Sequence, residues 1–344
     1  MDKDSKKVGP FSDNPLMIGY DNRLFESDPA LGHVFPENRI VDQKGLISLD
    51  EKIASIKESK GSFVVLNIGD SSTSGWNSDN VFYGCPDPYA ALFSYKTYSD
   101  ILQLKYSISS INAGVPGYTT YQAKKYLEIL LKKFSAEKIA IDYVTLYLGN
   151  NDCTYNGLED KTRIDSKIPS KGEILTRVSL EDFKNTYREM IKIIREYGAE
   201  PIILNSASNY KWQPGLRSKK YPEELQKQII KLTDQKIKVL FSESEKEFEQ
   251  QNFEASLEKD LLLPRIKEAY KKAVRNIGKE TSALLIEVQD CIKDESDFVD
   301  YCHPGEAASE RIADAVKACL KVKNTSNFQT PVPQDLPSDT YTLY

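Results

Sequence analysis

FVVLNIGDSSTSG, residues 63–75, is the stretch that predicts the fold. Its first half is a continuous run of apolar β-forming residues, which is typical of a fully buried parallel strand. The run breaks at Gly69-Asp70, a pair that often ends a regular element, and Asp, Ser and Thr are the residues that cap helix N-termini. We therefore predict a strand, a tight turn and the start of a helix, with Ser71 on the turn.

This arrangement would put the Ser71 hydroxyl at the carboxyl edge of a sheet, beside backbone N–H groups at the positive end of a helix dipole. In open α/β sheets, ligands bind outside that edge. On this stretch alone two interpretations stay open, because helix caps are far commoner than nucleophiles. Ser71 is either a nucleophile or, with Asp70 and Ser72, only a helix cap.

Length and composition describe an ordinary globular protein. The chain has 344 residues, 40% hydrophobic and 28% charged, which suits one large α/β domain or two modest ones. A formal net charge of −5 argues against a nucleic-acid binder. We expect no transmembrane segment and see no secretory signal, so a cytoplasmic location is the default, with a secreted or periplasmic mature form as the alternative. Five cysteines without CxxC pairing indicate neither a disulfide framework nor a zinc site.

Further apolar runs predict more strands, and segments with helical spacing separate them. After the strand that begins at Phe63, we expect strands at 107–112, 142–148, 201–205 and 283–288, and helices at 46–59, 88–106, 119–134, 180–197 and 306–322. Five strands alternating with helices predict a parallel, doubly wound sheet. The loops that follow its strands should then lie on one rim, at 70–75, 114–117, 149–152 and 205–209.

We expect the core domain over residues 61–323, with one segment before it, one after it and one long insertion within it at 210–279. Residues 1–60 form an N-terminal extension whose stretch LGHVFPENRIV should lie on the edge of the core, and residues 324–344 form an irregular tail. Residues 210–279 are rich in Lys, Glu and Gln, with a break at Leu263-Pro264, and predict a long helical excursion. It would serve as a lid or a homo-oligomer contact, and a simple solvent-exposed helix pair is the alternative.

Only two histidines occur, which narrows the search for the base that a serine nucleophile needs. His303 lies in Asp300-Tyr301-Cys302-His303-Pro304, just before the closing helix. An acid three positions earlier can reach the histidine Nδ1–H, fix the tautomer and leave Nε2 to take a serine proton. The alternative is that His303 only packs or caps at a helix start. His33 has no acidic partner nearby and is expected to be structural.

Gly114 ends the second predicted strand, and Asn151 follows the third. Acyl transfer needs donors directed at the oxygen that becomes negative in the tetrahedral intermediate. A glycine N–H, a side-chain amide and the N–H of the nucleophile itself would supply three such donors. Each residue also has an ordinary alternative, as a turn residue for Gly114 and as a helix cap for Asn151.

Four short blocks occur in order along the chain: Gly69-Asp70-Ser71 with Thr73 and Gly75, Asn112-Ala113-Gly114, Gly149-Asn150-Asn151-Asp152, and Asp300-x-x-His303-Pro304. Together they resemble the four blocks of the GDSL, or SGNH, hydrolase family over about residues 61–323. The resemblance implies a flavodoxin-like three-layer α/β/α sandwich with a five-stranded parallel sheet. It also implies a serine esterase that needs no metal and no organic cofactor.

The same resemblance assigns the site. Ser71 would be the nucleophile, His303 the base and Asp300 its orienting acid. The Ser71 N–H, the Gly114 N–H and the Asn151 side chain would form the oxyanion hole. One departure is Ser72, which stands where the family usually has an apolar residue and would loosen the packing of the helix.

The sequence lacks the residues that other kinds of catalytic or nucleotide-binding site require. The aspartates and asparagines in blocks 69–70 and 149–152 also resemble ligands of two-metal phosphoesterases, but such sites need several histidines. No G-x-S-x-G elbow, P-loop or dinucleotide fingerprint occurs. A non-enzymatic binding module remains the alternative to an enzyme, although intact serine, asparagine and histidine argue against it.

Tyrosines guide the choice of substrate. Of the 20 in the chain, five lie near the predicted rim in sequence: Tyr83, Tyr89, Tyr118, Tyr147 and Tyr155. Because aromatic faces stack on sugar rings, we favour a short-chain or O-acetyl ester of a glycan or small metabolite. The alternative reactions are hydrolysis of lysophospholipids or thioesters and acyl transfer to another alcohol. The alternative role for the tyrosines is packing in the core or on the surface.

Overall fold

The computed structural model describes residues 24–43, 45–59, 63–80, 87, 89–155, 160, 176–215 and 234–320. The expected C-terminal tail, the first part of the N-terminal extension and residues 216–233 of the expected excursion lie outside these ranges. No helix in the described ranges is both long and apolar enough to cross a membrane.

The sheet is built around β5 (Val64–Gly69), the strand in the stretch quoted first. β6 (Ser109–Gly114) lies on one side of it, and β7 (Tyr143–Tyr147), β8 (Glu200–Asn205) and β9 (Leu284–Glu287) follow on the other, all parallel. Counted along the chain, these five strands have the order 2-1-3-4-5, which is the flavodoxin-like arrangement. The register pairs Gly69 with Gly114 and with Tyr147, so three strands end level at the carboxyl edge.

The five expected parallel strands are confirmed, but within the described ranges the sheet has seven strands and not five. β3 (Ile40–Asp42) pairs antiparallel with β6 through Val41 and Asn112, and β4 (Gly45–Ile47) pairs antiparallel with β3. This hairpin from the N-terminal extension covers backbone groups on the edge of β6 that would otherwise be open. A separate antiparallel ribbon, β1 (Glu26–Asp28) with β2 (Gly32–Val34), precedes it.

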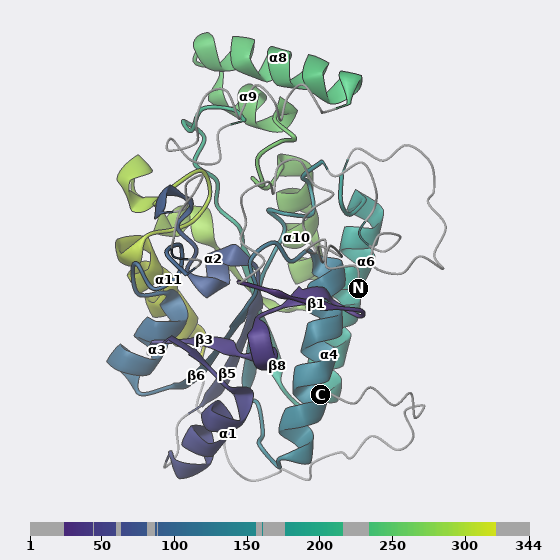
Figure 1. Ribbon diagram of the computed structural model, residues 1–344. Coiled ribbons are helices and arrows are strands. Elements are labelled where there is room, and N and C mark those ends of the chain that lie inside the picture. The colour runs from purple at the N-terminus through teal and green to yellow at the C-terminus, as the bar shows by residue number, and fades with distance from the viewer. Residues whose placement is uncertain are drawn as a thin grey trace, which may run out of the picture.

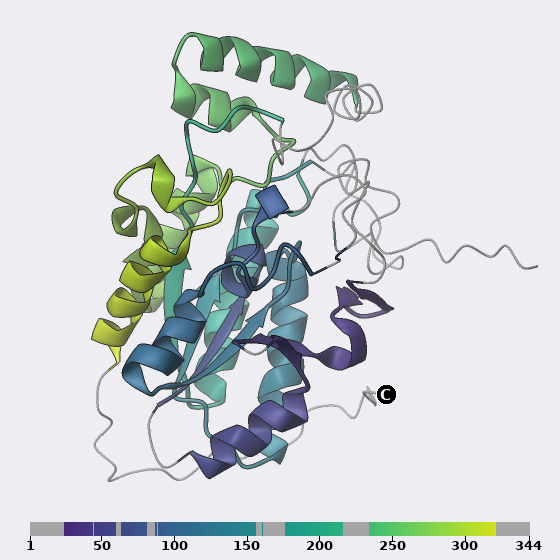
Figure 2. The same cartoon turned by 60° about the vertical axis from the view of Figure 1, so that its left-hand side comes forward.

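Helices cover both faces of the sheet, which confirms the three-layer sandwich (Figures 1 and 2). One face carries α1 (Leu49–Glu58), α4 (Thr120–Ala136), α6 (Leu180–Glu196) and α10 (Glu268–Thr281), and the other carries α3 (Tyr98–Tyr106) and α11 (Glu306–Cys319). Alternation along β5 serves both layers, since Leu66 and Ile68 join the first core and Val65 the second.

Two helices begin later than expected because a side chain caps them. Ser48 forms a capping box with Glu51 at the start of α1, which leaves Leu46 and Ile47 to β4. Thr97 forms a capping box with Asp100 at the start of α3, so residues 89–97 are turns and not helix. Single 3-10 turns lie at Pro36–Asn38 (η2), Ser78–Asn80 (η3), Val288–Cys291 (η4) and Glu295–Asp297 (η5).

The segment expected as a solvent-exposed excursion divides in two. α8 (Gln235–Glu249) and α9 (Phe253–Lys259) stack on each other beyond the carboxyl edge of the sheet (Figure 1). Ile237 and Phe241 of α8 form a small separate apolar cluster with Leu262. The predicted break at Leu263-Pro264 separates them from α10. The expectation of solvent exposure is wrong for α10, because its Val274 and Ile277 recur on one side and belong to the main core.

Candidate active site

Ser71 begins α2 (Ser71–Ser74), a single helical turn at the carboxyl end of β5. Asp70 caps the turn by accepting the Ser72 N–H at 2.8 Å, and Gly75 ends it with φ +83°. The predicted strand, turn and helix start are thus confirmed. Crossovers leave this part of the sheet toward opposite faces, so the turn lies at the topological switch point where such folds bind ligands.

Two glycines let α2 lie directly on the strand ends. A Cβ on Gly69 would lie 2.0 Å from Thr73 Oγ1, and a Cβ on Gly114 would lie 2.4 Å from the Ser74 nitrogen. Both distances are far below van der Waals contact, so neither position accepts a larger residue without movement. The height of Ser71 above the sheet is set by this contact.

The structure brings Ser71, His303 and Asp300 together, although 232 residues separate the first two. His303 Nε2 lies 2.7 Å from Ser71 Oγ, and His303 Nδ1 lies 2.6 Å from Asp300 Oδ2. All three side chains are buried, with Ser71 the most exposed at 8%. With Nδ1 protonated toward the carboxylate, Nε2 is able to accept the serine proton as Oγ attacks a carbonyl.

Backbone groups hold Asp300 in place. The N–H groups of Cys302 and His303 donate to Oδ1, and the Ser78 N–H donates to Oδ2, each at 3.0 Å. Burial alone would raise the pKa of Asp300, but the charge of His303 and the hydrogen bonds outweigh it and hold that pKa below the usual 3.8. Ser78 was not among the predicted residues, because nothing in its local sequence signals a contact with residue 300.

Asn151 lies in the loop after β7 and contacts Asp70, the residue before Ser71. Its Nδ2 donates to Tyr118 O at 3.0 Å and to Asp70 Oδ2 at 3.3 Å. The amide therefore lies between the nucleophile turn and the loop after β6, and the longer bond is the weaker of the two. Burial raises the pKa of Asp70 to about 6, against the opposing effects of the Ser72 hydrogen bond and the His303 charge.

Ser72 does not leave a packing defect. Its side chain is 6% exposed, and its Oγ accepts a hydrogen bond from Asn150 Nδ2 at 3.3 Å. Asn150 Oδ1 in turn accepts the Ile266 N–H at 3.0 Å. The expected loosening is replaced by a polar link between α2 and the Asn151 loop.

Gly114 is not well placed as a backbone donor. Its N–H donates to Asn112 Oδ1 at 3.1 Å, and its Cα lies against the backbone of α2. The geometry explains the glycine by close packing and not by a free N–H group. The expectation that Gly114 lines an oxyanion hole therefore conflicts with this hydrogen bond.

Gly117 is the better candidate in the same loop. It is the third residue of a turn in which the Tyr118 N–H donates to Val115 O at 3.2 Å, and its φ is +84°, as a type II turn requires. Within the described ranges its N–H meets no acceptor. The sequence carried a signal, because Pro116-Gly117 is the dipeptide that favours such a turn.

His33 supports this turn, in line with the structural role expected for it. Its buried Nε2 lies 2.9 Å from Pro116 O, and because a carbonyl only accepts, Nε2 is the donor. The Pro116 carbonyl and the Gly117 N–H belong to one planar peptide group. His33 thereby fixes the direction of the Gly117 N–H, and the Tyr118 hydroxyl ties the same ribbon to the loop by donating to His33 O at 2.7 Å.

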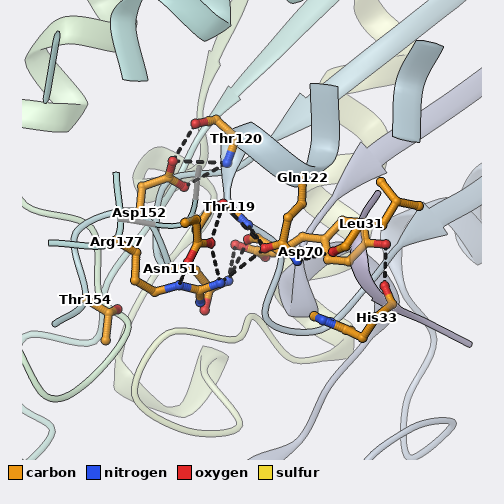
Figure 3. Close-up of polar contacts among 12 residues, drawn as sticks. Leu31, His33, Asp70, Thr119, Thr120, Gln122, Asn151, Asp152, Thr154 and Arg177 are labelled. Atoms are coloured by element: carbon orange, nitrogen blue, oxygen red, sulfur yellow. Dashed lines mark hydrogen bonds and ion pairs between the residues drawn. The ribbon is translucent and has the colours of Figure 1, made fainter. Parts of the chain in front are cut away.

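A buried polar network anchors the Asn151 loop from outside (Figure 3). Asp152 accepts the Thr120 N–H at 3.0 Å and the Thr120 hydroxyl at 2.5 Å. Arg177 forms an ion pair at 2.8 Å with Asp160, which is fully buried. Burial raises the pKa of Asp152 to about 7, although the Thr120 hydrogen bonds oppose the shift.

The five tyrosines give less support to sugar stacking than expected. Tyr118 and Tyr147 are buried in the core at 0% and 1% exposure, so they offer no free face. Tyr89 and Tyr155 are partly buried against apolar clusters. Tyr83 lies outside the described residues.

Asp300, Cys302 and His303 are the one described group whose ligand atoms lie close enough to hold a metal ion, within 4.8 Å of one another. Two of them already bond to each other through His303 Nδ1. Burial raises the pKa of the Cys302 thiol well above 9, so the thiolate that a metal needs is disfavoured. The group fits a hydrogen-bonded base and acid better than a metal site.

The sequence model described as "GDSL-like Lipase/Acylhydrolase family" matches residues 68–311. A search of curated proteins gives no match. Among solved structures, the acetylxylan esterase Axe2 from Geobacillus stearothermophilus is 17% identical with a TM-score of 0.39, covering 75% of this chain and 94% of its own. The lipase/acylhydrolase from Enterococcus faecalis is 17% identical with a TM-score of 0.40, covering 76% and 98%.

Proposed function

Because this chain belongs to the GDSL-like lipase/acylhydrolase family of ester-cleaving hydrolases, we propose that it is a serine esterase that works through an acyl-enzyme intermediate. The observation that carries the proposal is the 2.7 Å contact between Ser71 Oγ and His303 Nε2. The hydrogen bonds of Asp300 to Nδ1 of the same ring support it.

In this mechanism Ser71 Oγ attacks the ester carbonyl carbon while His303 Nε2 takes the hydroxyl proton. Asp300 stabilises the imidazolium that forms. His303 then gives the proton to the oxygen of the leaving alcohol, and the acyl group stays on Ser71. A water molecule, deprotonated by the same nitrogen, attacks the acyl carbonyl. His303 then returns the proton to Ser71 Oγ as the bond from Oγ to the acyl carbon breaks and the carboxylic acid leaves.

The negative oxygen of the tetrahedral intermediate needs preorganised donors. We assign this role to the N–H groups of Ser71 and Gly117 and to Asn151 Nδ2. Support comes from the Gly117 N–H, which meets no acceptor in the described ranges, and from the long 3.3 Å bond between Asn151 and Asp70, which an oxyanion can replace. Loss of one such donor typically costs about 10²–10³ in turnover.

For the acyl group we propose acetyl or another short chain. Ser71 is only 8% exposed, and polar side chains of Asp70, Ser72 and Asn151 lie around it in the described structure. A long hydrocarbon chain would have to desolvate these groups, which is unfavourable. The alcohol part is considered in the next subsection.

The test is hydrolysis of p-nitrophenyl esters of two to twelve carbons, together with labelling by a fluorophosphonate. Ser71→Ala should abolish both signals, and Ser242→Ala, on the exposed side of α8, should keep them. Turnover should fall as the acyl chain grows. Unchanged hydrolysis by Ser71→Ala would overturn the serine mechanism, and a preference for the longest chain would overturn the short acyl group.

A further inference from the structure

A cavity of about 590 Å³ opens at the carboxyl edge of the sheet. Its walls come from residues 209–213 after β8, residues 295–299 before Asp300, Asp79 in η3 and Phe248 near the end of α8. A volume of this size is typical of a small-molecule site, where about 300–1,000 Å³ is usual. None of its walls is a residue that the mechanism above uses, so it needs an explanation of its own.

Short links join the cavity to Asp300. Val299 in its wall directly precedes Asp300, and Asp79 follows Ser78, whose N–H donates to Asp300 Oδ2. Asn209, also in the wall, donates from Nδ2 to Asp300 O at 3.2 Å. The cavity therefore shares its framework with the acid of the triad.

Aromatic rings connect the cavity to the imidazole as well. The ring of Trp212, in the cavity wall, lies 6.2 Å from that of Tyr301 in an edge-to-face contact. The ring of Tyr301 lies 5.5 Å from that of His303. A ligand against Trp212 is thus two ring contacts from the base.

The strand order puts the cavity on the alcohol side of the site. Gly117 and Asn151 follow β6 and β7, whereas the loops around the cavity follow β8 and β9. In the mechanism the oxyanion forms against the first two residues, and His303 protonates the leaving oxygen. The alcohol part of the ester therefore extends away from β6, toward β8 and β9.

The lining combines two kinds of surface that a neutral sugar uses. Three aromatic rings, of Trp212, Phe248 and Phe298, offer flat apolar contact. Hydrogen-bonding groups come from Asp79, Asn209 and Gln213 and from Lys211 and Glu295, which form an ion pair with each other. Pyranose C–H faces pack against rings, while sugar hydroxyls donate to carboxylate and amide oxygens. A hydrocarbon chain would desolvate these polar and charged groups. The one lysine in the lining, Lys211, is matched by Glu295, so the lining has no excess of positive charge for an anionic alcohol.

Asn209 supplies a further observation. Its side chain is 7% exposed, and its Oδ1 is buried without a hydrogen-bond partner in the described structure. Buried acceptors are almost always satisfied. A hydroxyl group held in the cavity that Asn209 lines would provide the missing donor.

We propose that this cavity is the subsite for the alcohol part of the substrate and that it binds a neutral sugar unit bearing the ester. The inference rests on the proposed esterase function and adds the class of alcohol. It assigns specificity to residues of the α8 end and of the loops after β8 and β9, outside the Ser71, His303 and Asp300 cluster.

The experiment compares kcat/KM for β-glucose pentaacetate with kcat/KM for p-nitrophenyl acetate, which carries no sugar. Phe248→Ala should lower the ratio of sugar ester to p-nitrophenyl ester at least tenfold, mainly through a higher KM for the sugar ester. Asp79→Asn should lower the same ratio, without the risk of collapsing an apolar contact. The matched control is Val239→Ala, on the exposed side of α8, which should leave the ratio unchanged.

Binding of glucose pentaacetate to the Ser71→Ala protein, measured by calorimetry, separates this inference from the esterase proposal. Tight binding that Phe248→Ala weakens tenfold supports the subsite even if no ester is turned over. An unchanged ratio in both cavity variants, with p-nitrophenyl acetate still cleaved, overturns the subsite and leaves the esterase intact. A lysophospholipid is assayed alongside as a third ester. If the cavity variants lower kcat/KM for the lysophospholipid and leave kcat/KM for the sugar ester unchanged, the sugar assignment is overturned.

Discussion

His303 depends on Asp300 for its tautomer, and Asp300 depends on backbone N–H groups for its own position. Each of these contacts spans at most three residues except the Ser78 N–H, which comes from 222 residues away. Thus η3 (Ser78–Asn80), which follows the nucleophile turn along the chain, helps to hold the acid through the Ser78 N–H. Single substitutions here change which nitrogen of His303 carries the proton, or remove the hydrogen bond from His33 to Pro116 O.

Asp300→Asn should lower kcat for p-nitrophenyl acetate by about 10³–10⁴. The amide NH₂ donates to Nδ1 and drives the ring proton to Nε2, the nitrogen that has to accept the serine proton. KM should change little. Steady-state kinetics between pH 6 and 9, which give both kcat and KM, check this prediction. Glu310→Gln, on the exposed side of α11, is the control and should behave as wild type. Retention of more than a tenth of kcat would argue against the tautomer role.

His33→Phe should lower kcat about tenfold to a hundredfold with little change in KM. Phenylalanine keeps the ring contacts with Phe25 and Tyr118 but loses the donor to Pro116 O, so the peptide group of Gly117 is no longer held. His33→Gln keeps a donor and should recover most of kcat. Equal losses in the two variants would indicate packing and not orientation of the peptide.

At the scale of elements, the return from α9 to α10 links the two halves of the site. Arg265 is fully buried, pairs with Asp260 at 2.8 Å and donates to Asn209 O and Trp212 O, both at 3.1 Å. Its own carbonyl accepts the Cys153 thiol at 3.2 Å. The segment therefore contacts the loop after β7 and the loop after β8 at once, and it carries α8 and α9 with it.

Arg265→Met should lower the free energy of unfolding by about 3–5 kcal/mol, because it leaves the buried Asp260 carboxylate without its counter-charge. Urea denaturation followed by far-UV circular dichroism measures the change. The double variant Arg265→Met with Asp260→Asn should recover part of the loss, since no buried charge then remains. Strictly additive effects of the two substitutions would contradict the pairing.

Gly114→Ala should destabilise the fold by about 1–3 kcal/mol, the usual cost of forcing extra atoms into a packed site. The added methyl would overlap the backbone of α2, which also displaces Ser71, so kcat should fall with stability. Gly278→Ala is the matched control, because the nearest atom to its Cβ is 3.6 Å away and alanine favours a helix interior. Urea midpoints for the two variants should move in opposite directions.

For the whole molecule, buried carboxyl groups make stability depend on pH. Burial raises the pKa of Asp70 to about 6 and that of Asp152 to about 7, whereas both titrate near 4 in an unfolded chain. Between these values the folded state binds more protons, so the free energy of unfolding falls as pH rises from about 4 to 7. Asp300 acts in the opposite sense, because its lowered pKa contributes stability that is lost as pH falls below about 4.

Urea midpoints should therefore be highest near pH 4.5–5 and decline toward pH 7.5. Asp152→Asn should flatten the decline, since the amide does not titrate, and the change should be roughly 3 kcal/mol between the ends of the window. Glu310→Gln again serves as the control, because that carboxylate is exposed. An identical slope in Asp152→Asn and wild type would exclude Asp152 as its source.

The amino-acid sequence by itself determined those features of the protein that depend only on contacts between residues close together in the chain. The apolar run before Gly69, the cap at Asp70 and the short reach from Asp300 to His303 all depend on neighbours within four residues. The order of the four blocks then indicated the family. The alternation of strands and helices along the chain predicted the parallel arrangement of β5 to β9, because right-handed crossovers place such strands side by side in one sheet.

Tertiary structure alone decided the features that depend on distant partners. β3 joins the sheet because the edge of β6 is available to it, and α10 is buried because the sheet lies beneath its apolar side. The Gly114 N–H donates to Asn112, whereas the Gly117 N–H meets no acceptor among the residues that the structure describes. This difference depends on the directions that the Asn112 side chain and the turn take after folding. Whether a polar group is free or occupied is a property of the packed molecule, because the partner that satisfies it is chosen by the fold and not by the adjacent sequence.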